Sequence, residues 1–118
     1  KRLTHDLMVD SGYGHAVPRQ RAYPREYRDD LASTICRDLG LGSDDFCVLK
    51  LCNRQRGAGV VPLKVAELQE ALRLLLRPPE DAGAWLKAQA SPLAQPVEWG
   101  SLDEQSRHWW SNECPCFV

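Results

Sequence analysis

The chain has 118 residues, a formal net charge of −1, and a composition that is 43% hydrophobic and 26% charged. This length supports one domain with one modest core, and this composition is ordinary for a soluble folded protein rather than a disordered or fibrous one. The small net charge argues against nucleic acid as the main partner. No stretch approaches the roughly 20 apolar residues of a membrane helix, so we expect no membrane association.

The first 23 residues show no sustained apolar period, and Gly12, Gly14 and Pro18 interrupt any regular element. We therefore expect the chain to begin with an irregular segment. Three parts are predicted: an irregular arm, 1–23; a helical domain, 24–112; and a Cys-Pro-Cys tail, 113–118.

Two segments carry strong helix signals. The first, 24–40, begins with a proline and ends with a glycine, as helices commonly do. The second, 61–79, places Leu68, Leu72 and Leu75 on one face and charged residues on the other, which predicts a helix packed on the core.

Two shorter helices are expected over 79–90 and 101–110. In the second of these, Trp109 follows the inner face and should be buried. Neighbouring helical residues point about 100° apart, so Trp110 should be more exposed.

The segment 46–52 is apolar at every position except Lys50. A short apolar run of this kind is typical of a buried strand or of a buried helix, and its period does not separate the two. The predicted fold is mainly α, a small single domain of four to five short helices. The alternative is an α+β fold with 46–52 as a buried strand.

The segment 31–56 resembles a helix-turn-helix, with a glycine at the expected turn. On this interpretation, the DNA-binding candidates are Lys50, Arg54 and Arg56. Two aspartates at the start of the second helix would face phosphates and weaken binding. Nucleic acid is therefore a possible but disfavoured partner.

Catalytic and metal-binding patterns are weak. The three histidines show no metalloprotease spacing, and no nucleophile has an evident base beside it. A single Cys-x-Cys is less than the paired units typical of structural zinc. We predict no catalytic residue, no metal ligands and no cofactor.

The chain has five cysteines, an odd number that cannot pair completely within one chain. Several lie in apolar surroundings, which favours a reduced, cytoplasmic protein. Cys114 and Cys116 are the candidate modification or thiol site, on an extended tail where both are expected to be exposed. Three interpretations stay open for this tail. Aromatic residues tie it to the core, one thiol pairs with Cys36, Cys47 or Cys52, or the tail is presented to a partner or metal.

Together these patterns favour a non-enzymatic, small helical protein-interaction module whose partner is another protein. One alternative is a helix-turn-helix DNA-binding regulator that uses residues 31–56. The other is a carrier protein whose C-terminal cysteines are modified or bind metal.

Overall fold

The computed structural model describes residues 2–54, 57–78, 80–81, 108–111 and 113–118. In this part of the chain the helices are α1 (Arg2–Met8), α2 (Leu31–Leu39) and α3 (Leu68–Leu76), and the strands are β1 (Tyr23–Pro24), β2 (Phe46–Lys50), β3 (Val60–Lys64) and β4 (Cys116–Phe117). Shorter helical turns are η1 (Val9–Tyr13), η2 (Gly14–Ala16) and η3 (Val65–Glu67). The fold is α+β with two small antiparallel sheets, so the prediction of a mainly α protein with four to five helices is wrong.

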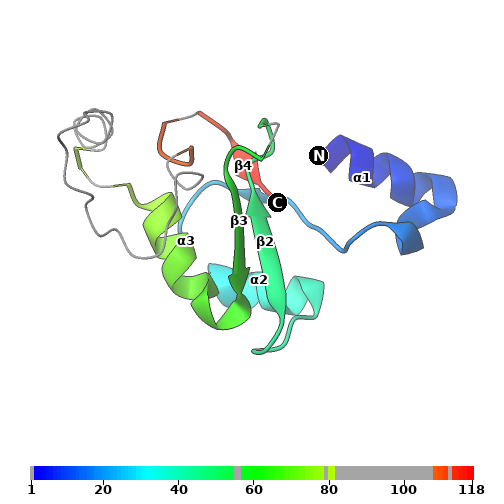
Figure 1. Ribbon diagram of the computed structural model, residues 1–118, viewed down its shortest axis with the longest axis horizontal. Helices are drawn as coiled ribbons and strands as arrows, with labels where there is room; N and C mark the ends of the chain where they lie inside the picture. Colours follow the sequence, from blue (N-terminus) through cyan, green and yellow to red (C-terminus); the bar gives the residue numbers. More distant parts are fainter. Residues whose placement is uncertain (1, 55–56, 79, 82–107, 112) are drawn as a thin grey trace.

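β2 and β3 form an antiparallel hairpin, in which Phe46 lies opposite Lys64 and Lys50 lies opposite Val60 (Figure 1). The alternative strand is therefore confirmed, but it is buried on one face only. Phe46 is 69% exposed whereas Leu49 is 3% exposed. The residues of β3 were predicted as the start of a helix. They form a strand because valines suit the pleated surface and β2 supplies the partner.

The C-terminal residues form the strand β4, which lies between β1 and the end of β2. Phe117 pairs with Tyr23 on one side and forms a bridge with Leu51 on the other. Lys50 and Val118 exchange both backbone hydrogen bonds, at 2.7 and 2.9 Å. The predicted tail is therefore an inner strand that joins the two sheets, as the red segment beside β2 in Figure 1 shows.

The outer edge of β3 has all of its outward backbone N–H groups accounted for. Lys50, which lies opposite Val60, directs its backbone N–H and C=O groups to Val118 of β4. In the antiparallel pattern, the backbone polar groups of Val60, Pro62 and Lys64 therefore point away from β2. The Val60 N–H donates to the Gly57 carbonyl at 3.1 Å, and the Lys64 N–H donates to the Glu67 carboxylate at 3.0 Å. Pro62 has no N–H. This edge offers no donor to another strand.

α2 begins later than predicted and ends where predicted. Its first residue is Leu31 rather than Pro24, because Pro24 pairs with Cys116 in the β1–β4 sheet. Gly40 ends the helix in the left-handed conformation, with φ of 63°. The N–H groups of Gly40 and the next residue bond back to the last turn of α2, in the manner of a Schellman motif.

The core lies between the sheets and helices α2 and α3. The predicted inner face of α3 is confirmed, because Leu68, Leu72 and Leu75 are each 0% exposed. Trp109 is also 0% exposed and Trp110 is half-buried, as predicted. The other largest fully buried side chains are Leu31, Leu51 and Phe117.

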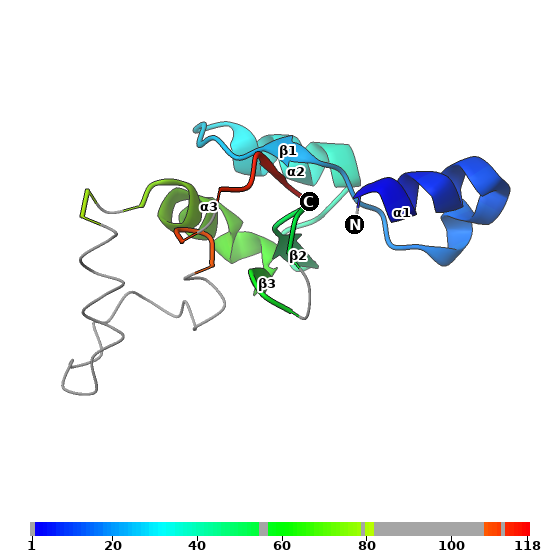
Figure 2. The same cartoon turned by 90° about the horizontal axis from the view of Figure 1, so that it is seen from above.

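Residues 2–16 of the N-terminal arm form helical turns rather than an irregular segment, whereas residues 17–22 have no regular structure. α1 continues into η1 and η2 through a kink at Gly12, where φ is 83°. Gly12 interrupts the helical backbone at this kink, and helical turns resume after it. Figures 1 and 2 show α1 at one end of the molecule, apart from α2 and α3. Leu3 and Leu7 are exposed on it, at 72% and 57%.

The predicted helix 79–90 and most of the predicted helix 101–110 fall outside the described residues. Residues 108–110 form a turn. The arm and tail boundaries otherwise stay predictions. No helix in the described ranges is long and apolar enough to cross a membrane.

Candidate functional site

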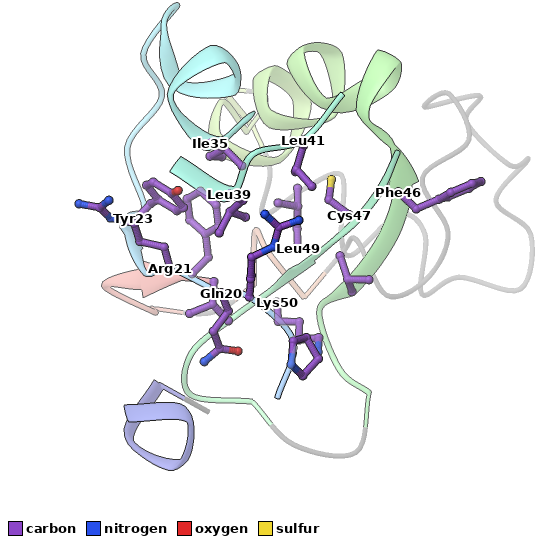
Figure 3. Close-up of a pocket in the computed structure, with 15 residues that line it drawn as sticks. Gln20, Arg21, Tyr23, Ile35, Leu39, Leu41, Phe46, Cys47, Leu49 and Lys50 are labelled. Carbon is purple, nitrogen blue, oxygen red and sulfur yellow. The ribbon is translucent and has the colours of Figure 1, made fainter. Parts of the chain in front are cut away.

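A cavity of about 410 Å³ lies along one side of β2, between that strand, the end of α2 and the segment before β1. We call it the edge cavity. Figure 3 shows it with its lining side chains as sticks. Its lining residues are Pro18, Arg19, Gln20, Arg21, Tyr23, Ile35, Leu39, Leu41, Phe46, Cys47, Val48, Leu49, Lys50, Phe117 and Val118.

The edge cavity follows the side of β2 rather than one of its faces. All five consecutive residues from Phe46 to Lys50 line it, although their side chains alternate between the two faces of the strand. In Figure 3 the Phe46 side chain points away from the cavity, while Leu49 points toward it. The backbone of β2 therefore forms one wall.

This wall carries unpaired backbone groups. Lys50 uses its N–H and C=O for Val118, so the same groups of Val48 and Phe46, two and four residues earlier, face the same side. β4 ends its pairing at Lys50. Within the described ranges, no backbone partner faces Val48 or Phe46 on that side. The edge cavity thus contains an open strand edge.

The floor of the edge cavity is apolar. Ile35 and Leu39 reach it from α2, and Leu41 follows directly after that helix. Leu49 from β2 and Phe117 from β4 complete the floor, and both are buried. Amphipathic spacing in α2 explains this arrangement, because residues four apart point to the same side of a helix.

Tyr23 closes one end of the floor. Its ring lies 5.7 Å from that of Phe117, measured between centroids, and its hydroxyl donates to Asp38 at 3.3 Å. Burial raises the pKa of the Tyr23 hydroxyl to about 12, and the negative charge of Asp38 adds to this effect. Tyr23 therefore stays neutral and acts as a hydrogen-bond donor at neutral pH.

The rim of the edge cavity is cationic. Arg19, Arg21 and Lys50 line it. Arg21 is paired with Asp38, with 3.4 Å between Nη1 and Oδ2. Neither Arg19 nor Lys50 has an ion-pair partner among the residues that the structure describes. Arg19 and Lys50 therefore add two positive charges to the lining of the cavity.

Of the three residues predicted to bind DNA, the two that the structure describes do not lie on a helix. Lys50 lies at the end of β2, and Arg54 follows the strand with its buried Nε lacking a hydrogen-bond partner within the described part of the chain. Arg56 lies outside the described residues. The segment expected to form the second helix of a helix-turn-helix is β2, so that motif is wrong. A strand forms because its alternating burial fits the hairpin.

The two predicted thiol residues lie beside a third cysteine. Cys114 is 5% exposed, and its thiol donates to the carbonyl of Cys116 at 2.9 Å. The expected exposure is therefore wrong for Cys114, because β4 holds this segment against the core. Cys116 is half-buried, and its thiol is one of the groups that raise the pKa of Cys52.

The environment of Cys52 disfavours its charged form. Burial raises the pKa of this thiol to about 12, and the hydrogen bond to Cys116 and the nearby Cys116 and Cys114 thiols add to the shift. All five cysteines are free thiols. The described residues contain no group of three or more histidine, cysteine or acidic side chains that could hold a metal ion.

Sequence reasoning missed the edge cavity. Arg19 and Arg21 stand in a segment that was expected to be irregular, and only the fold brings them beside β2. The available signal was the pair of arginines two apart just before Tyr23, since alternate residues of an extended segment share a face. Comparison with protein-family models, with curated proteins and with solved structures gives no match for this chain. The function proposed below therefore rests on the residues of the site.

Proposed function

We propose that the protein is a protein-interaction module that binds an extended, acidic segment of a partner protein in the edge cavity. The observation that carries this proposal is the open edge of β2 inside that cavity. An extended peptide that adds to an exposed strand edge gains main-chain hydrogen bonds, and side-chain pockets beside the edge give specificity.

The open edge supplies the main-chain part of the interaction. The N–H and C=O groups of Phe46 and Val48 face the cavity, and a peptide strand would pair with them on the side of β2 that is turned away from β3. The cavity volume of about 410 Å³ falls within the usual range for binding sites. It is large enough for a few side chains of the added strand.

The floor and the rim define the chemistry of the peptide. Alternate side chains of an added strand point to opposite faces, so every second one would meet the apolar floor at Ile35 and Leu39. The charges of Arg19 and Lys50 favour carboxylates on the segment and speed its encounter with the site. The partner segment therefore alternates aliphatic with acidic residues.

A defined probe tests this proposal. We use an acetylated and amidated peptide of about six residues in which valine alternates with glutamate, a length typical of one strand. Binding is followed by calorimetry and by amide chemical shifts of isotope-labelled protein. We expect saturable binding below about 1 mM, with the largest shifts at Phe46 and Val48. Val60 and Lys64, on the opposite edge of the hairpin, should not shift.

Two control peptides separate the contributions. Replacing glutamate by lysine should abolish binding, and methylating the backbone nitrogens should do so without changing any side chain. The double variant Arg19→Glu with Lys50→Glu should weaken binding at least tenfold, about 1.4 kcal/mol. The single variant Lys64→Glu makes the same type of charge change on β3, outside the cavity lining, and should weaken binding far less.

Three outcomes would overturn the proposal. The glutamate peptide fails to bind, the methylated peptide binds equally well, or the lysine peptide binds as tightly as the glutamate peptide. If the protein alone shows concentration-dependent shifts at Val48 and sediments as a dimer, the edge is occupied by a second copy, and a separate partner is the wrong occupant.

A further inference from the structure

Cys52 and Cys116 lie directly opposite each other on neighbouring strands. Lys50 and Val118 exchange both backbone hydrogen bonds, and Leu51 bridges to Phe117, so the next pair in this antiparallel register is Cys52 with Cys116. The Cys52 N–H donates to the Cys116 carbonyl at 3.3 Å, in agreement with that register.

The side chains of this pair meet on one face. Leu51 and Phe117 are both buried, so their neighbours Cys52 and Cys116 point to the other side of the sheet, where the Cys116 thiol helps to raise the pKa of Cys52. A hydrogen-bonded antiparallel pair has its Cα atoms about 5.5 Å apart. That spacing falls inside the range of about 4.4–6.8 Å that disulfides adopt.

The third thiol of this cluster is held differently. Cys114 donates its S–H to the Cys116 carbonyl, and it is more buried than Cys116. A bond between cysteines separated only by Pro115 also meets the geometric limits of a disulfide poorly. The register therefore selects Cys52 as the partner of Cys116.

We propose that Cys52 and Cys116 form an oxidisable dithiol that closes to a disulfide when the protein meets a peroxide. In the first step the Cys116 sulfur attacks one peroxide oxygen, the O–O bond breaks, and water leaves with the thiol proton, which gives a sulfenic acid. In the second step the Cys52 sulfur attacks the Cys116 sulfur, the S–O bond breaks, and a second water carries away the Cys52 proton. Two thiols lose two electrons and two protons, and hydrogen peroxide is reduced to two water molecules.

The order of these steps follows from the environment of the two thiols. Burial, with a contribution from the neighbouring Cys116 thiol, keeps Cys52 protonated and raises its pKa to about 12. A protonated thiol reacts slowly with peroxide. We therefore assign the first step to Cys116, and the second to Cys52, which lies opposite Cys116 in the register.

Closure would attach β4 covalently to the chain that follows β2. The closed loop would include the hairpin turn, β3 and α3. A disulfide that closes a long loop removes conformational freedom from the unfolded chain, so the oxidised protein should melt about 10 °C above the reduced protein.

The test is a disulfide map of the wild-type protein. The folded protein is treated with stoichiometric hydrogen peroxide, free thiols are blocked with N-ethylmaleimide, and the product is digested with trypsin without reduction. Cleavage after Lys50, Arg54 and Arg107 releases one peptide with Cys52 and one with both Cys114 and Cys116. We expect these two peptides to be linked and the intact protein to lose the mass of two hydrogen atoms.

Fragmentation at the Cys114–Pro115 bond then shows which C-terminal cysteine carries the link, without a variant. As a matched pair, Cys116→Ser should abolish the linked peptide and Cys114→Ser should retain it. Cys36 and Cys47 serve as internal controls that stay alkylated singly. A link to Cys114, a bond between two molecules, or full alkylation of Cys52 after peroxide treatment would overturn the proposal.

Discussion

Gly59 is fixed by its backbone conformation and by two neighbours, Leu51 in the same hairpin connection and Trp109 from a distant part of the chain. Its φ of 69° lies in the left-handed region, and a Cβ added there would lie 2.8 Å from Cδ1 of Leu51. Its carbonyl accepts the indole N–H of the fully buried Trp109 at 3.0 Å. Gly59 therefore allows Leu51 to approach the hairpin turn closely and anchors the indole of Trp109 through its carbonyl.

Gly59→Ala should destabilise the protein more than Gly57→Ala. Both positions have positive φ, but a Cβ at Gly57 meets nothing within 4 Å. Gly57→Ala carries only the conformational cost, about 1–2 kcal/mol. Gly59→Ala adds a clash with a fully buried side chain, about 1–3 kcal/mol more. Urea denaturation of the two variants measures the difference, and equal losses would show that Leu51 moves aside freely.

Tyr23 makes the stability of the protein depend on alkaline pH. Its hydroxyl has a pKa of about 12 in the folded protein against a usual value of 10.0. The unfolded chain therefore loses this proton first as the pH rises, and the free energy of unfolding falls between about pH 10 and 12. The slope from Tyr23 approaches about 1.4 kcal/mol per pH unit within that window.

Tyr23→Phe should remove this slope, while Tyr13→Phe in the exposed arm should leave it. The Cys52 thiol, whose pKa is also raised to about 12, adds a slope of the same sign in every variant. Comparing denaturation curves from pH 8 to pH 12 isolates the part due to Tyr23. An unchanged slope in Tyr23→Phe would place the hydroxyl in contact with water.

At the scale of elements, the two ends of the chain contribute unequally to the fold. β4 is paired on both sides, and its Phe117 is 0% exposed and contacts the ring of Trp109. The N-terminal arm has exposed leucines, and Figures 1 and 2 show α1 beyond the body of the domain. The strand at the C-terminus is therefore an integral part of the core, whereas α1 is peripheral.

Deleting residues 116–118 should destabilise the protein by more than about 3 kcal/mol, because Phe117 leaves the core and two strand edges lose their partner. Deleting residues 2–16 should cost less than about 1 kcal/mol. Both truncated proteins are compared with the parent by circular dichroism and chemical denaturation. A cooperative transition at the parent's midpoint after loss of 116–118 would contradict the assignment of β4 to the core.

The local features of these elements were readable from the sequence. The end of α2 at Gly40 and the inner face of α3 follow from residue types and spacing within a few turns. β3 was missed, because a run of valines before a helix becomes a strand only when β2 lies beside it. The position of β4 depends on contacts with Tyr23 and Leu51, far away in the chain, and no local pattern encodes them.

The same limit applies to the candidate site. Cys114 and Cys116 were recognised as unusual, but their burial and the role of Cys52 follow from the register of β4. The edge cavity is made by three separate segments of the chain, and its lining is encoded in none of them alone. Properties that depend on where one strand ends relative to another are absent from any single segment of sequence.

For the whole molecule, the contrast between the two edges of the hairpin has a consequence for assembly. Polymers of stacked strands, such as fibrils, grow only when each added unit presents a fresh edge to the next one. Here β2 can accept one strand, but the outward donors of β3 are consumed by Gly57 and Glu67 or removed at Pro62. A molecule that docks through its open β2 edge therefore presents no free N–H donors on β3 to a further strand. The hairpin can pair with one strand without starting the growth of a fibril.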